Sequence, residues 1–115
     1  MPRVFGFHEV ELRREVDPAE YERFLAEEII PGPVLPGWQV RLLKGERGTR
    51  AGKYLLVFEI ESLEARNRFF PEAGEDSEES RRFFEQHPDA AAAWEKVGAF
   101  ESGTMDFNDY LVVAE

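Results

Sequence analysis

Residues 53–61 form a segment that is apolar on both faces, and this feature constrains the fold more than any other. Side chains of an extended strand alternate between two sides. One side carries only large apolar side chains, namely Tyr54, Leu56, Phe58 and Ile60. The other side carries Leu55 and Val57. A strand of this kind belongs at the centre of a sheet that is covered on both faces.

The residues before this segment predict a strand, a helix and a second strand. Residues 4–12 alternate with a period of two. Asp17 is placed to cap a helix whose first residue is a proline, and Pro31-Gly32-Pro33 cannot continue that helix. A second strand is expected over residues 38–43. A glycine-punctuated loop then leads into the central strand.

Residues 62–100 predict a helical region with two breaks, followed by a last strand. Ser62 is expected to cap the first piece, which ends before Pro71. Asp76 and Glu79 have the spacing of a capping box, which predicts that Asp76 caps the second piece. Pro88 interrupts the helix again. The last strand is expected over residues 110–114, and Phe107 is a candidate for its start.

The order strand, helix, strand, strand, helix, strand predicts a ferredoxin-like α+β fold in a single domain over residues 1–115. Right-handed crossovers give a four-stranded antiparallel sheet in the order 4-1-3-2, with both helical regions on one face. The second sheet face is half apolar and carries three charged positions, Glu9, Arg41 and Glu59. Monomers rarely expose such a patch. We therefore expect a homodimer in which two sheets pack together into an α+β barrel.

Composition excludes several classes of function. A net charge of −10 disfavours binding to nucleic acid and to anionic lipid, because both require a basic surface. The absence of cysteine excludes disulfides, thiolate catalysis and cysteine-ligated metals. No apolar stretch approaches the ~20 residues of a membrane span, and the first residues do not resemble a signal peptide. We expect a cytoplasmic protein that binds no metal and no cofactor.

Two runs near the start carry a family resemblance: Phe7-His8-Glu9-Val10-Glu11-Leu12 and Val16-Asp17-Pro18-Ala19-Glu20-Tyr21-Glu22-Arg23-Phe24. They resemble the opening of dimeric α+β barrel proteins. Over about the whole chain the pattern is similar to the antibiotic-biosynthesis-monooxygenase, NIPSNAP and stress-responsive A/B-barrel groups. The resemblance implies a homodimer with ligand cavities between each sheet and its own helices. Members include cofactor-free oxygenases, haem-degrading enzymes, isomerases and proteins without known activity.

The active-site residues of these groups do not transfer to this chain. Some oxygenases of the group use a pocket Asn, Trp and Tyr, and haem-degrading members use a helix His together with an Asn on the first strand. Here the first strand carries His8 and no Asn. His87 lies roughly where a helix ligand would, but Pro88 follows it. The resemblance therefore predicts the fold and leaves the reaction open.

Five residues are candidates to line a ligand pocket between the sheet and the helices: His8, Trp38, Tyr54, His87 and Trp94. His8 is the candidate base, because histidine exchanges protons near neutral pH. The alternative is a core histidine bonded to a carbonyl group or to water. For His87 the choice is between a haem or metal ligand and a residue that bonds the last carbonyls of a helix. The aromatic residues either line a pocket or fill a core.

The charged positions on the second face also have two interpretations. Glu9 and Glu59 lie on neighbouring strands, and two buried carboxylates held close together would serve acid–base chemistry. The alternative is an ion pair with Arg41, since buried charges are usually paired. Three functions remain open: a cofactor-independent oxygenase or isomerase acting on a small apolar or aromatic molecule, a non-catalytic binding module, and a haem-binding protein.

Overall fold

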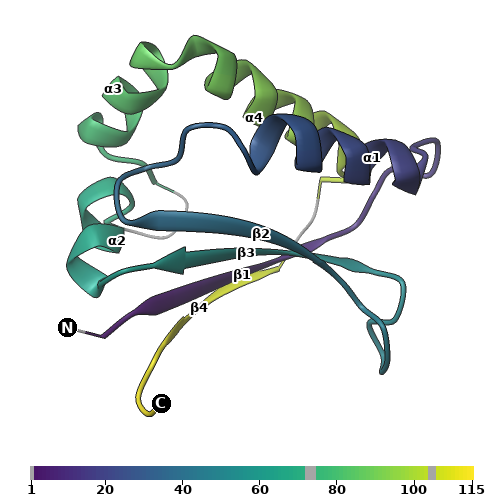
Figure 1. Ribbon diagram of the computed structural model, residues 1–115, viewed down its shortest axis with the longest axis horizontal. Coiled ribbons are helices and arrows are strands. Elements are labelled where there is room, and N and C mark those ends of the chain that lie inside the picture. Colours follow the sequence, from purple (N-terminus) through teal and green to yellow (C-terminus); the bar gives the residue numbers. More distant parts are fainter. Residues whose placement is uncertain (1, 72–74, 104–105) are drawn as a thin grey trace.

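The four strands form one antiparallel sheet in the order β2-β3-β1-β4 in the computed structural model, which describes residues 2–71, 75–103 and 106–115 (Figure 1). Most of the helices lie over one face of this sheet, and the helix that follows β3 lies at its end. The elements are β1 (Val4–Val10), α1 (Pro18–Phe24), a π-helical turn η1 (Leu25–Ile29), β2 (Trp38–Lys44), β3 (Tyr54–Ile60), α2 (Leu63–Phe69), α3 (Glu78–Gln86), α4 (Pro88–Phe100) and β4 (Phe107–Leu111). The predicted ferredoxin-like topology is confirmed, with β3 and β1 at the centre.

Strand register decides which side chains share a face. His8 lies opposite Leu56 on β3 and opposite Phe107 on β4, and all three point toward the helices. Phe7 lies opposite Val57 and Asn108, on the other face. The predicted assignment of faces along β1 and β3 is therefore correct.

Side-chain caps mark the beginnings of the helices. The Asp17 carboxylate accepts a hydrogen bond from the backbone N–H of Ala19 at 3.0 Å, as predicted. Ser62 caps α2 in the same way. The predicted cap of α3 is wrong by one residue: Ser77 accepts from the N–H of Ser80 at 3.2 Å. Asp76 instead pairs with Arg81, because the extended backbone that begins the helix falls at Ser77.

The last strand begins at Phe107, the candidate start, and ends at Leu111, three residues before the expected end at residue 114. Its pairing with β1 runs from Val4 opposite Leu111 to His8 opposite Phe107. This register places Phe107 and Asp109 on the helix side of the sheet.

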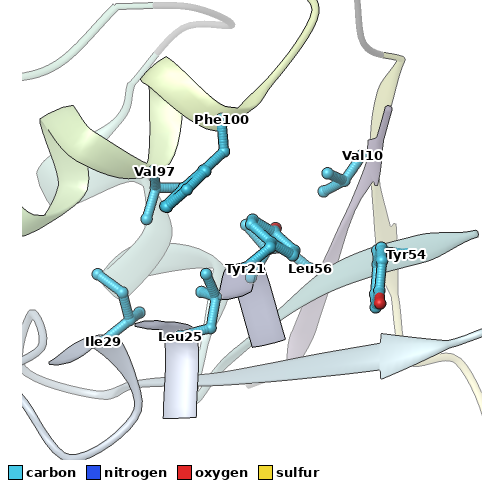
Figure 2. Close-up of a cluster of buried hydrophobic side chains, with 8 residues drawn as sticks. All are labelled: Val10, Tyr21, Leu25, Ile29, Tyr54, Leu56, Val97 and Phe100. Carbon is cyan, nitrogen blue, oxygen red and sulfur yellow. The ribbon is translucent and has the colours of Figure 1, made fainter. Parts of the chain in front are cut away.

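The core fills the end of the molecule where α1 and α4 cross β3 and β1 (Figure 2). Tyr21 and Leu25 are fully buried, and the Tyr21 ring lies 5.6 Å from that of Phe100. The whole cluster comprises Val10, Tyr21, Leu25, Ile29, Tyr54, Leu56, Val97 and Phe100. These residues anchor one half of the helical layer tightly on the sheet. The other half of that interface is hollow.

Candidate functional site

A cavity of about 600 Å³ lies between the sheet and the helices, beside the packed core. Strands β1, β2, β3 and β4 supply its floor, and α2, α3, α4 and the segment before β2 supply its walls. The lining consists of Gly6, His8, Pro33, Val34, Leu35, Trp38, Val40, Phe58, Ile60, Arg66, Phe70, Pro71, Phe83, Phe84, Trp94, Phe107 and Asp109. Cavities of this size accept small organic ligands.

Aromatic rings dominate the lining and hold one another in place. Phe58 at the centre of the floor lies 6.0 Å from the Trp38 ring and 5.9 Å from the Trp94 ring. The Phe70 ring also lies close to Trp38, with 5.5 Å between the two ring centroids. The indole N–H of Trp38 is buried without an acceptor among the described residues, although a buried indole usually finds one. Both tryptophans of the chain therefore lie in the cavity wall.

His8 lies in this apolar lining and points toward the helices. Its ring stands edge-on to Phe58 at 4.9 Å and stacks on Phe107 at 5.2 Å. Burial among these groups lowers the pKa of His8 from its ordinary value of 6.5, and the nearby Asp109 carboxylate opposes that shift. A lowered pKa keeps the imidazole neutral at physiological pH, so one ring nitrogen can accept a proton.

The other polar side chains of the lining are Arg66 and Asp109. The Arg66 guanidinium of α2 forms an ion pair with the Asp109 carboxylate of β4. Both side chains are partly exposed, at 24% and 30%. Asp109 lies directly opposite Gly6 in the β1–β4 ladder, which places it two residues from the position opposite His8. The three polar groups thus gather at the β4 edge of the cavity.

Sequence reasoning missed Arg66 and Asp109. The signal for Asp109 was Gly6 within a strand pattern, since glycine in a strand often marks the close approach of another group. A Cβ atom at Gly6 would lie 2.9 Å from Oδ1 of Asp109. No such sequence feature pointed to Arg66, because its ion pair with Asp109 depends on the position of α2 in the folded protein.

Two of the five predicted pocket residues lie outside the lining. Tyr54 belongs to the packed core, where its hydroxyl donates a hydrogen bond to Glu22. Burial, together with that carboxylate, raises the pKa of Tyr54 to about 12. His87 caps the end of α3, with Nδ1 2.9 Å from the Phe83 carbonyl oxygen, so the helix-end alternative describes its contact. Tyr54 lies on the predicted face of β3 but at the packed end of the strand, and His87 lies at the end of α3. The structure brings together His8, Trp38 and Trp94.

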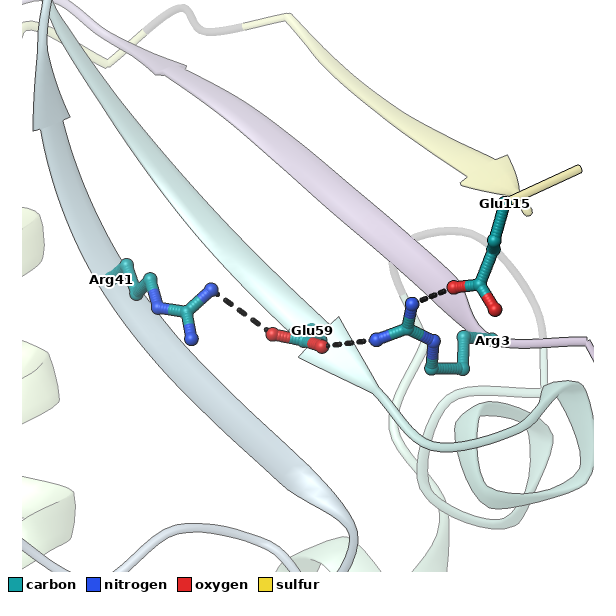
Figure 3. Close-up of polar contacts among 4 residues, drawn as sticks. All are labelled: Arg3, Arg41, Glu59 and Glu115. Carbon is teal, nitrogen blue, oxygen red and sulfur yellow. Dashed lines mark hydrogen bonds and ion pairs between the residues drawn. The ribbon is translucent and has the colours of Figure 1, made fainter.

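The charged positions on the second sheet face form ion pairs (Figure 3). Glu59 lies between two arginines, 2.7 Å from Arg3 and 3.0 Å from Arg41. Glu9 instead lies 3.3 Å from Arg50. In the ladder Glu9 lies opposite Leu55 and Glu59 opposite Phe5, so the two carboxylates are four residues apart along the strands. They do not form a carboxylate pair.

The described residues contain no group of three or more His, Asp or Glu side chains placed to hold a metal ion. Among the same residues, no helix has the length and apolarity to cross a membrane.

Comparison with solved structures confirms the ferredoxin-like fold. A NIPSNAP family protein from Agrobacterium tumefaciens superposes with a TM-score of 0.64 at 14% identity, over 96% of this chain and 86% of its own. A putative antibiotic biosynthesis monooxygenase from Bordetella bronchiseptica superposes with a TM-score of 0.61 at 16% identity, over 99% of this chain and 100% of its own.

A third structure bears on assembly. A dimeric protein of unknown function and ferredoxin-like fold from Bacteroides fragilis superposes with a TM-score of 0.53 at 16% identity, over 96% of each chain. No family model and no curated protein matches this sequence. At these identities the likeness defines a ferredoxin-like fold, in a set of neighbours that includes dimers and a monooxygenase-like protein.

Proposed function

We propose that this protein binds a small, largely apolar aromatic molecule in the cavity and that His8 removes a proton from it, as in a cofactor-independent oxygenase or isomerase. The observation that carries the proposal is a neutral imidazole in an aromatic-walled cavity of about 600 Å³. A general base needs a pKa below or near the working pH and a position beside the substrate. His8 has a lowered pKa and lies in the cavity lining, which supports this role.

The proton transfer can be written with the groups that line the cavity. An O–H or acidic C–H bond of the ligand breaks, and a new N–H bond forms on the His8 ring. The electron pair stays on the ligand, and the imidazolium formed on His8 balances that charge, so the cavity as a whole remains neutral. The likeness to a putative monooxygenase supports this class of reaction.

Binding is tested with N-phenyl-1-naphthylamine, a neutral aromatic probe that becomes fluorescent in apolar sites. Because both tryptophans lie in the cavity wall, bound probe should quench their emission as its own emission rises. Val40→Phe fills part of the cavity floor and should weaken binding about tenfold or more. Val113→Phe adds the same ring at a position that is 93% exposed and should leave binding unchanged. Equal affinity in both variants would contradict the proposal.

The proton transfer is tested with 2-tetralone, an uncharged aromatic ketone whose α-hydrogens exchange with solvent when a base removes them. The wild-type protein in D₂O should speed this exchange, because His8 removes the proton and solvent returns a deuteron. His8→Gln keeps a polar side chain of similar size and removes the base. The variant should still bind the ketone but lose the acceleration. Binding with no acceleration in either protein would favour the alternative function, a non-catalytic binding module.

The haem-binding alternative receives less support from the geometry. His87 is engaged with the Phe83 carbonyl group and does not line the cavity. We propose that the protein does not bind haem with functional strength. A Soret shift on titration with haemin that disappears in His87→Ala would overturn this.

We further propose that the protein works as a homodimer joined through its open face, the helix-free side of the sheet. This face includes Phe5, Phe7, Glu9, Gln39, Arg41, Leu43, Leu55, Val57, Glu59, Asn108 and Tyr110. Its exposed apolar groups include Tyr110 at 57% and Leu43 at 47%. The dimeric neighbour from Bacteroides fragilis supports this arrangement.

A further inference from the structure

The cavity lining contains one fixed positive charge and one fixed negative charge. Among the described residues that line it, only Arg66 and Asp109 carry a permanent charge, and these two side chains form an ion pair. They come from α2 and β4, 43 residues apart in the chain. The lining is therefore electrically neutral as long as this pair is intact and His8 is uncharged.

The position of Asp109 depends on the backbone of the neighbouring strand. Its carboxylate oxygen Oδ1 lies within 2.9 Å of the point where a side chain at Gly6 would begin. The carboxylate thus lies over β1 on the cavity side, in space that only glycine leaves open. There it reaches Nη1 of Arg66.

The guanidinium of Arg66 is held from a second side as well. Its Nε donates to the side-chain oxygen of Asn67 at 2.8 Å. With its orientation fixed by Asn67 and its charge matched by Asp109, Arg66 is a prepared anion receptor that already holds an anion. A carboxylate or sulfonate ligand would have to displace Asp109 or lie beside it. Both options cost free energy, because displacing Asp109 breaks the ion pair and lying beside it brings two negative charges together.

We infer that Asp109 sets the charge selectivity of the cavity: it occupies Arg66 and so directs the cavity to uncharged aromatic ligands and against anionic ones. The inference rests on the proposed binding function and adds the class of ligand. It also implies that removing the Asp109 charge converts the cavity into a site for aromatic anions, because a guanidinium without its partner favours a new carboxylate or sulfonate.

Two probes with the same scaffold test this selectivity. N-phenyl-1-naphthylamine is neutral, and 8-anilinonaphthalene-1-sulfonate adds one sulfonate group to the same rings. The wild-type protein should bind the neutral probe more tightly. Asp109→Asn and Asp109→Ser should each tighten binding of the sulfonate by about tenfold or more, the order expected for one charge-assisted hydrogen bond. The readout is the ratio of sulfonate affinity to neutral-probe affinity, which should rise by the same order in both variants.

Controls separate charge from loosened structure. Arg66→Gln combined with Asp109→Asn removes both charges and should return sulfonate binding to the wild-type level, whereas general loosening would leave it raised. Asp76→Asn breaks another Arg–Asp pair outside the lining and should have no effect. If the neutral probe binds and both Asp109 variants keep the wild-type preference, the inference is overturned alone. If neither probe binds the wild-type protein, the proposed function fails and the inference fails with it.

Discussion

Glu101 is a buried carboxylate just beyond the last residue of α4. It is 8% exposed and has no cationic partner within salt-bridge distance among the described residues. Burial raises the pKa of Glu101 above its ordinary value of 4.5, and its charge contributes to raising the pKa of Tyr21. A raised pKa in the folded state means that the folded protein holds this proton more tightly than the unfolded chain does. The stabilisation is complete below the unfolded pKa and is lost as the pH rises through the folded pKa.

Glu101→Gln should therefore stabilise the protein at neutral pH, because the amide cannot ionise. We expect a gain on the order of 1 kcal/mol in the free energy of unfolding at pH 7. The gain should shrink as the pH falls toward 4.5. Urea denaturation over this pH range measures both effects. The exposed position Glu11→Gln is the matched control and should not change the slope with pH. A loss of stability at neutral pH in Glu101→Gln would show that the carboxylate makes a favourable contact.

For single residues, the alternating pattern predicted the sheet face to which a side chain points better than it predicted what lies around that side chain. It placed His8 on the helix side correctly, because side chains in a strand alternate strictly. It did not show that Tyr54, on the same side, lies at the packed end of β3 and not beside the cavity. Asp109 was missed because its partner on β1 follows from a ladder register that starts at Phe107. Register depends on contacts between distant segments, which a local pattern does not contain.

The beginning of α1 depends on one hydrogen bond from a side chain. Asp17 accepts from the Ala19 N–H, which has no partner within the helix. Asp17→Ala should lower the free energy of unfolding by about 1 kcal/mol, the usual cost of a lost N-cap. Asp17→Asn keeps an oxygen acceptor and should retain most of the stability. Equal losses in the two variants would indicate that charge, and not capping, is what Asp17 contributes.

Helix beginnings and ends were predicted well where one residue type dominates the choice. The helical region that begins with α1 ends before Pro31, and Pro88 separates α3 from α4. A proline ring removes a backbone N–H donor and clashes with the preceding turn of a helix. At α3 two good caps stand side by side, Asp76 and Ser77, and their intrinsic preferences are nearly equal. The π-helical turn η1 was not predicted at all. In this turn the Ile30 N–H donates to the Leu25 carbonyl group, five residues back in place of the usual four.

At the scale of the whole molecule, the open face predicts the state of assembly. Light scattering should give a mass twice that of the 13.3 kDa chain. Phe7→Glu places a charge beside Tyr110, whose ring lies 5.4 Å away, and should convert the dimer to monomers. Ile30→Glu changes an exposed apolar residue outside the open face and should leave the dimer intact. A wild-type mass near 13 kDa at micromolar concentration would contradict the proposed dimer.

The topology of the whole chain was predictable because few arrangements satisfy the order of elements and the hand of the crossovers. The class of ligand was not predictable from the sequence, because aromatic residues from segments far apart in the chain shape the cavity. Phe70, Phe83 and Phe107 reach the same cavity from α2's end, α3 and β4. In the sequence, each of these phenylalanines is equally consistent with a packed core.

The pairing of β4 with β1 has a consequence for synthesis. Strand β1 leaves the ribosome before β4, so its outer edge has no partner until Phe107–Leu111 have been made. At about 5–20 residues per second, roughly a hundred intervening residues take several seconds to add. During that time the edge that contains Gly6 and His8 is open, and open strand edges are prone to pair with other chains. The cavity also acquires Asp109 only when β4 is made, because this residue lies on that strand.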